Sequence, residues 1–212
     1  MMIILLIIQL IAISTATKLI TPGTIIGGGR IGSFLYESNN KLDTLITRSS
    51  GQTINEDTQG PIYICTRNDD LNDIITKTPI KRRSDLVFLQ NGVLENLLRT
   101  HNLLDNTQGL IYFAVNKKGE PPIDGKTDLT PEGLTSITGK WAQDFANRLI
   151  GSGLACHVLN KEKWTIAMYE KLIWISAFMI VGAKYGGCTV GMSCISYSIV
   201  QCINNRFLFD YF

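Results

Sequence analysis

Residues 24–32 read Thr-Ile-Ile-Gly-Gly-Gly-Arg-Ile-Gly. The apolar residues 24–26 predict a short β-strand, and the amphipathic stretch 31–38 predicts a helix after it. The glycines between them have the spacing Gly-x-Gly-x-x-Gly, which allows a tight turn, close approach of the backbone to a pyrophosphate, and close packing of helix on strand. The pattern predicts a dinucleotide-binding loop, and a glycine-rich turn without a ligand stays open as the alternative. The candidate cofactor-binding residues of this loop are Gly27, Gly28, Gly29, Arg30, Ile31 and Gly32.

Short apolar runs recur after this loop, separated by segments long enough for crossover connections. They lack polar alternation, as expected for strands that are buried on both faces of a parallel sheet. The predicted strands are 43–47, 61–66, 85–89 and 109–115, and helical spacing is found in 69–76 and 94–104. The fold class predicted from this alternation is α/β, with a Rossmann-type doubly wound parallel sheet.

The pattern becomes helical after Lys140. Residues 155–159 could add a strand, and residues 163–183 predict one long helix. Its almost wholly apolar part, 172–183, has twelve residues, too few to span a bilayer, so a buried core helix is expected. The sheet is thus expected to be followed by a partial all-helical C-terminal domain. The predicted organisation is a segment 1–17, a nucleotide-binding domain 18–163 and a partial helical domain 164–212, with Trp141, Phe145, Trp164 and Trp174 in the core.

Composition narrows the function classes. The 212 residues include 20 Lys and Arg against 18 Asp and Glu, a near-balance that gives no electrostatic drive towards nucleic acid. The five cysteines and two histidines lack the spacing of zinc ligands, so no metal site is expected. The basic cluster 81–83 is interpreted as a solvated end of a crossover.

Residues 1–14 form an apolar segment that is shorter than a membrane-spanning helix. Its length is typical of a signal-peptide core, and residues 14–16 suit a cleavage site, although no Lys or Arg precedes the run. The segment predicts targeting to the secretory pathway or an organelle, with a soluble mature protein. A cytoplasmic location and a buried first strand stay open.

The residues after the second predicted strand bear on the choice of cofactor. NAD-binding proteins usually have a carboxylate there for the ribose 2′-hydroxyl, about 20 residues beyond the glycine loop. Here Arg48 lies 19 residues after Gly29 and is followed by Ser49 and Ser50. A guanidinium can donate two parallel hydrogen bonds to the 2′-phosphate of NADP(H), so these residues predict NADP(H) as the cofactor. An Arg48 that merely faces solvent is the alternative.

Several motifs occur together in a fixed order along residues 24–185. After the glycine loop and Arg48 come Cys-Thr-Arg at 65–67, Leu-Gln-Asn-Gly at 89–92 and Met-Tyr-Glu-Lys-Leu at 168–172. This ordered set resembles the ketopantoate reductase (2-dehydropantoate 2-reductase) family. The resemblance implies an NADPH-binding Rossmann domain, an all-helical domain, and a small 2-oxo-acid substrate bound in the cleft between them.

The resemblance also implies roles for three residues. Arg67 would lie near the cofactor, Asn91 beside the nicotinamide, and Lys171 would be the catalytic lysine. The chemistry suits a lysine, because an ammonium can stabilise the negative charge that develops on the carbonyl oxygen and can donate the proton. A lysine whose chain lies along a buried helix with its ammonium in solvent is the alternative for Lys171.

The chain also departs from the family pattern. Ile175 stands one turn after Lys171 where the family has Asn, and Met179 replaces another polar residue. Residues from about 188 match no family element and are interpreted as an atypical tail, or as a shorter variant that pairs with another subunit. Two functions stay open: a 2-dehydropantoate 2-reductase-like NADP-dependent oxidoreductase, and a non-catalytic NADP-binding Rossmann protein. A membrane-associated protein is a weaker third, and a homodimer stays open as the assembly.

Overall fold

The computed structural model describes residues 20–126, 128 and 130–184. They form two compact units, which are described separately. The first comprises residues 20–90 and 95–159, and the second comprises residues 91–94 and 160–184. The targeting segment expected at 1–17 and the atypical tail expected from 188 lie outside the described residues.

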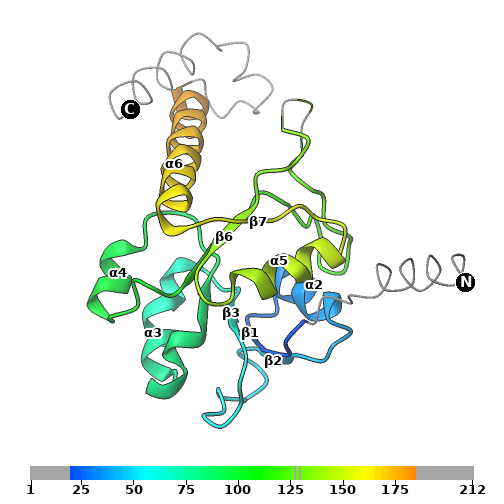
Figure 1. Ribbon diagram of the computed structural model, residues 1–212, viewed down its shortest axis with the longest axis vertical. Helices are drawn as coiled ribbons and strands as arrows, with labels where there is room; N and C mark the ends of the chain where they lie inside the picture. Colours follow the sequence, from blue (N-terminus) through cyan, green and yellow to red (C-terminus); the bar gives the residue numbers. More distant parts are fainter. Residues whose placement is uncertain (1–19, 127, 129, 185–212) are drawn as a thin grey trace, which may run out of the picture. The chain divides into compact units, whose positions relative to one another are not determined.

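The first unit is built on one seven-stranded sheet with the order β2-β1-β3-β4-β5-β6-β7 (Figure 1). All neighbouring strands are parallel except β5 and β6, which pair antiparallel. From β1 the chain moves to one side for β2 and returns to the other side for β3, so the strand order reverses at β1. The strands are β1 Thr24–Ile26, β2 Thr44–Ile46, β3 Ile62–Ile64, β4 Leu86–Phe88, β5 Thr107–Leu110, β6 Ser136–Thr138 and β7 His157–Val158.

Helices cover both faces of this sheet. Figure 1 shows α2 and α5 on one side and α3 and α4 on the other. Contacts of α2 with β1 and β2, and of α5 with β5, β6 and β7, agree with this arrangement. The doubly wound α/β fold predicted from the sequence is therefore confirmed, with one antiparallel pairing in a mostly parallel sheet. The helices are α2 Arg30–Ser38, α3 Leu71–Lys77, α4 Glu95–Thr100 and α5 Ala142–Gly151, with 3-10 turns η1 Asn68–Asp70 and η2 Ile80–Asp85.

The core under α2 and α5 explains why the short apolar strands are stable. Ile25, Tyr63 and Val87 of neighbouring strands pack with Leu35 of α2 and Phe145 of α5, and each of these side chains is 0% exposed. Burial of one such side chain contributes roughly 1.5–3 kcal/mol. This packing holds the carboxyl ends of β1 and β3 in a fixed register.

Two strands differ from the sequence prediction. β5 covers Thr107–Leu110, whereas residues 109–115 were expected, and β6 was missed. Both strands contain buried polar residues, which hid them from a search for apolar runs. Two of the buried hydroxyls are bonded: Thr107 Oγ1 in β5 accepts from the Trp141 backbone N–H at 2.9 Å, and Thr135 Oγ1, just before β6, accepts from that of Tyr112 at 3.0 Å.

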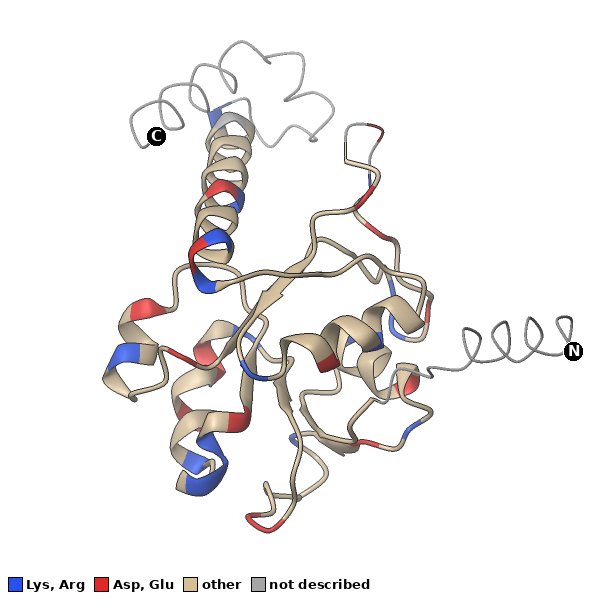
Figure 2. Cartoon of the chain, in the orientation of Figure 1, with Lys and Arg blue, Asp and Glu red and all other residues tan. Residues whose placement is uncertain are grey.

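The described part of the second unit is dominated by α6, Lys161–Lys184, which contains the predicted helix 163–183. Trp164 is buried as expected, but Trp174 is 47% exposed and contacts Phe178 in a tilted arrangement with ring centroids 4.6 Å apart, so its assignment to the core was wrong. Figure 2 shows long stretches of α6 without charged side chains. Among the described residues α6 alone is long and apolar enough to cross a membrane, a test by length and composition that core helices of soluble proteins also pass.

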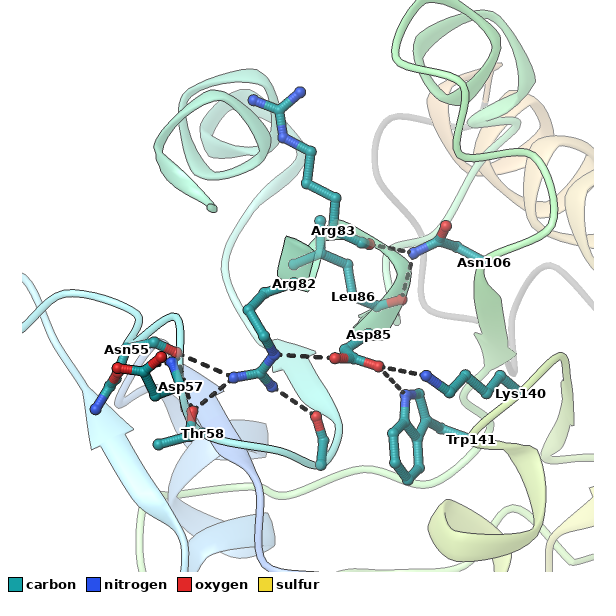
Figure 3. A network of polar contacts seen from close by, with 11 residues as sticks. Asn55, Asp57, Thr58, Arg82, Arg83, Asp85, Leu86, Asn106, Lys140 and Trp141 are labelled. Atoms are coloured by element: carbon teal, nitrogen blue, oxygen red, sulfur yellow. Dashed lines mark hydrogen bonds and ion pairs between the residues drawn. The ribbon is translucent and has the colours of Figure 1, made fainter. Parts of the chain in front are cut away.

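The basic cluster 81–83 was interpreted from the sequence as solvated, but the structure shows one of its arginines buried. Arg82 is 4% exposed, and its Nε donates to Asp85 at 2.9 Å. The same guanidinium donates to Thr58 and to the carbonyls of Asn55 and Gly60, in the loop before β3 (Figure 3). The other Asp85 oxygen accepts from Lys140 at 2.7 Å and Trp141 at 3.1 Å. This network joins three segments at the amino end of the parallel strands.

A second buried ion pair lies at the same end of the sheet. Arg148 of α5 donates twice to Asp43, and both side chains are 0% exposed. The guanidinium also donates to the carbonyls of Leu35 and Thr21, and it lies 4.9 Å from the ring centre of Tyr63. Removal of either charge would leave the other buried and unpaired, so this pair fixes α5 against the segments before β1 and β2.

Candidate functional site

The carboxyl end of β1 is where the strand order of the first unit reverses. β2 and β3 pair with β1 on its two sides, and all three run parallel. The loops that follow them therefore emerge at one edge of the sheet and diverge from each other. In open α/β sheets this point is where ligands bind.

Close neighbours leave no room for a side chain at the first two glycines after β1. Gly27 has φ +106°, a conformation that side chains other than glycine rarely adopt. A Cβ on Gly27 would lie 2.8 Å from the Cys65 carbonyl oxygen, and one on Gly28 would lie 2.9 Å from Cγ2 of Thr47. The loop after β1 is thus packed between the loops after β3 and β2.

The last glycine of the motif lets α2 lie against this loop. A Cβ on Gly32 would lie only 1.8 Å from the Gly27 carbonyl oxygen, so no other residue fits without a backbone shift. Ser33 secures the same contact, because its Oγ donates to the Gly28 carbonyl at 3.2 Å. Gly29 differs, since a Cβ there would have no neighbour within 4 Å. Gly27, Gly28 and Gly32 shape the loop, whereas Gly29 leaves its surface open.

The first turn of α2 is suited to an anion. Gly29 is its N-cap and supplies no side-chain cap, and the first turn has no acidic residue. The backbone N–H groups there carry the partial positive charge of the helix end. Arg30 is exposed beside them and donates to the Asn116 carbonyl at 3.4 Å, while Ile31 is partly buried.

Arg48 follows β2 in a turn rich in hydroxyl groups. Its side chain is 82% exposed and donates to Asp70 of η1 at 2.8 Å. Ser50 Oγ donates to the Thr47 carbonyl at 3.0 Å, and the hydroxyls of Thr47 and Ser49 lie 3.2 Å apart. The turn therefore presents a guanidinium and hydroxyl groups, and it lies directly beside Gly28.

Arg67 follows β3 and also faces solvent. Its side chain is 78% exposed, with Asp69 4.0 Å away. Gln90, after β4, donates to the carbonyls of Ile64 and Thr66 at 2.9 and 3.1 Å, and so fixes the loop that contains Arg67. Sequence reasoning noted Gln90 within a motif but missed this positioning role, and it missed Asp70 because no periodicity or spacing marks it.

Cys65 lies at the inner side of the glycine loop. Burial raises the pKa of its thiol to about 12, with Arg148 opposing this shift more weakly. The thiol is therefore neutral at physiological pH and does not act as a nucleophile. Its role here is to pack, since a Cβ on Gly32 would lie 3.2 Å from its own Cβ.

The two remaining candidates, Asn91 and Lys171, belong to the second unit. Asn91 is exposed, and Lys171 is 7% exposed in the middle of α6. Burial lowers the pKa of Lys171 to about 8, which leaves it largely protonated at pH 7. Within the described ranges no cluster of three or more His, Cys, Asp and Glu could hold a metal ion.

The edge of the first unit fits the phosphates of a dinucleotide. Close packing at Gly28 and Gly32 holds the glycine loop against its neighbours, its surface is open at Gly29, and the first turn of α2 offers N–H groups without a competing carboxylate. The exposed guanidinium of Arg48 follows the strand beside it. The structure thus brings the glycine loop and Arg48 together, with Arg67 on the next loop.

Solved structures share this fold. A probable 2-dehydropantoate 2-reductase from Bacillus subtilis matches with a TM-score of 0.57 at 15% identity, over 89% of this chain and 74% of that chain. A dimeric ketopantoate reductase from Staphylococcus aureus matches with a TM-score of 0.56 at 18% identity, over 90% and 71%. D-mandelate dehydrogenase with NADH and anilino(oxo)acetate matches with a TM-score of 0.50 at 13% identity, over 74% and 62%. No protein-family model and no curated protein matches the chain. At these identities the likeness establishes the fold, which is that of the ketopantoate reductases.

Proposed function

We propose that this chain is an NADP(H)-dependent oxidoreductase of the ketopantoate reductase type, which reduces a small 2-oxo acid to the hydroxy acid. The observation that carries the proposal is the glycine loop, open at Gly29, at the point where the strand order reverses, with Arg48 on the adjacent loop. The fold shared with reductases of this kind supports it.

The residues of the first unit would hold the cofactor. The N–H groups at the start of α2 and the open surface of Gly29 would bind the pyrophosphate, with Arg30 beside them. Arg48 and Ser49 would bind the 2′-phosphate, and Arg67 would contribute positive charge. By the family resemblance, Asn91 would hold the nicotinamide. When bound, this cofactor supplies the hydride equivalent for the reduction.

Lys171 would supply the proton. With a pKa of about 8 its ammonium is mostly charged at pH 7 and still acidic enough to give up the proton readily. In the proposed reaction it donates to the carbonyl oxygen as negative charge develops there, and it stabilises that charge until the proton has moved.

A second candidate function is NADP binding without turnover. Ile175 lies one turn after Lys171 in α6, where the family pattern has Asn, and an apolar side chain cannot hydrogen-bond a hydroxy acid. This observation favours either a substrate different from ketopantoate or the loss of catalysis.

A homodimer is part of the proposal. The solved ketopantoate reductase from Staphylococcus aureus is described as dimeric. In this chain α6 exposes large apolar side chains, with Trp174 at 47%, Met179 at 69% and Ile180 at 62%. Sedimentation of the full chain would show the dimer, and a monomer at micromolar concentration would contradict the proposed homodimer.

The test is oxidation of NADPH by the full chain with ketopantoate and with pyruvate or 2-oxoisovalerate. We expect turnover with at least one acid, and a fall in kcat of about 10²–10⁴ in Lys171→Met, the usual worth of a positioned proton donor. Lys163→Met is the matched control, because Lys163 is exposed on the same helix. NADPH binding without turnover would leave only the second candidate, and absence of binding would overturn both.

A further inference from the structure

The ion pair between Arg48 and Asp70 spans the place where the strand order reverses. Arg48 lies in the loop after β2 and Asp70 lies in the 3-10 turn after β3, and these two strands flank β1. The 2.8 Å bond therefore joins the two loops on either side of the glycine loop. A nucleotide whose pyrophosphate rests on the glycines would place its ribose next to this pair.

The Asp70 carboxylate bonds to Arg48 and not to the backbone of its own helix. Asp70 is the N-cap of α3, a position where Asp commonly accepts a hydrogen bond from the helix backbone, yet it makes no side-chain cap bond. Its carboxylate is 27% exposed and accepts from Arg48 instead. The Arg48 side chain is 82% exposed and has this one hydrogen bond within the described part of the chain, so most of its five N–H donors face solvent.

We propose that Asp70 is a specificity-determining residue that restrains the preference of Arg48 for a 2′-phosphate. This inference rests on the proposed function. A 2′-phosphate needs the same guanidinium that Asp70 holds, and it also meets the like charge of the carboxylate. A free 2′-hydroxyl meets no such repulsion. Asp70 therefore weakens NADP(H) binding while leaving NAD(H) binding almost unaffected.

The experiment measures the binding of 2′,5′-ADP and 5′-AMP by calorimetry, together with NADPH and NADH, to the full chain and its variants. Asp70→Asn should tighten 2′,5′-ADP and NADPH about two- to fivefold, the range expected when an exposed ion pair is removed. Binding of 5′-AMP and NADH should stay the same, and the gain should shrink as salt is raised.

The matched control is Asp73→Asn. Asp73 lies one turn away on α3 and also holds a cation at 2.8 Å, Lys77, so its variant loses the same charge without freeing Arg48. The gain from Asp70→Asn should also vanish when Arg48→Ala is present. Circular dichroism would verify that each variant is folded.

The outcomes separate this inference from the proposed function. Equal gains in Asp70→Asn and Asp73→Asn, or a gain that persists without Arg48, would overturn the role of Asp70 while NADPH binding stands. If the unaltered chain binds neither NADPH nor 2′,5′-ADP, the proposed function fails, and the role of Asp70 falls with it.

Discussion

The two ends of the parallel strands use arginine in opposite ways. At the amino end, Arg148 and Arg82 are 0% and 4% exposed, and each guanidinium is bonded to a carboxylate and to backbone carbonyls. At the carboxyl end, the side chains of Arg48 and Arg67 are 82% and 78% exposed and each lies near a single carboxylate. Guanidinium N–H groups that are bonded within the fold hold the chain together, whereas those that face solvent are available to a ligand.

The largest expected effect is at the amino end. Arg148→Met would leave the Asp43 carboxylate buried with only the N–H groups of Gly23 and Asn39 as partners. A broken buried ion pair costs roughly 3–5 kcal/mol in the free energy of unfolding. Urea denaturation would measure this loss.

The control for that variant is Arg99→Met. Arg99 pairs with Glu95 on α4, and both side chains are at least half exposed. Its loss should change the free energy of unfolding by less than about 1 kcal/mol. Similar losses in the two variants would contradict the distinction between the buried and exposed arginines.

A second prediction separates two glycines of the Gly-x-Gly-x-x-Gly motif. Gly32→Ala puts a methyl group 1.8 Å from the Gly27 carbonyl, so the loop must shift, at a cost of about 1–3 kcal/mol in unfolding free energy. NADPH binding should weaken at least about tenfold, since each tenfold is about 1.4 kcal/mol. In Gly29→Ala the added methyl group has no atom within 4 Å, so the free energy of unfolding should stay within about 1 kcal/mol of that of the unaltered chain. This variant should nevertheless bind NADPH less tightly. Thermal unfolding and fluorescence titration would show whether the two effects separate in this way.

The third prediction concerns the carboxyl end alone. Arg48→Ala should weaken NADPH binding by about 1.5–3 kcal/mol, the usual worth of a hydrogen bond to a charged group, and leave NADH binding nearly unchanged. Because the ion pair with Asp70 is exposed, the free energy of unfolding should change by less than about 1 kcal/mol. NADPH affinity that is unchanged in Arg48→Ala, or lost equally with NADH affinity, would show that Arg48 does not bind the 2′-phosphate.

The fourth prediction is a pH dependence in the second unit. Lys171, with a pKa of about 8, loses its proton above that pH, so kcat/KM for the 2-oxo acid should be flat below pH 8 and fall above it. The unfolded chain has the ordinary pKa of 10.5, so it binds more protons between pH 8 and 10.5. The contribution of Lys171 to the free energy of unfolding should therefore rise with pH in that window. A flat kcat/KM profile up to pH 10 would exclude Lys171 as the proton donor.

The sequence was most informative where local patterns decide the structure. The glycine spacing predicted the loop after β1, and the apolar runs predicted β1 to β4, because both features depend on neighbouring residues. β5 and β6 instead contain or adjoin buried hydroxyls such as those of Thr107 and Thr135, whose partners are backbone N–H groups distant in the sequence.

Charged residues were harder to interpret for the same reason. Arg82 looked like part of a solvated cluster, but its acceptors come from the loop before β3 and from Asp85. Asp70 carried no signal at all, since its partner Arg48 lies 22 residues away. An arginine's role is set by the acceptors that the fold brings to it, and one-dimensional spacing does not reveal these.

The most direct test is hydrogen–deuterium exchange of the full chain with and without saturating NADPH. With NADPH bound, we expect slower exchange at the carboxyl end of the strands, in residues 27–33, 47–50 and 66–70. We expect no change in exchange at the amino end, in residues 55–60 and 82–85. Protection confined to the amino-end segments, or NADPH binding that leaves the glycine loop unprotected, would contradict the claim that the carboxyl end of this sheet is the cofactor site.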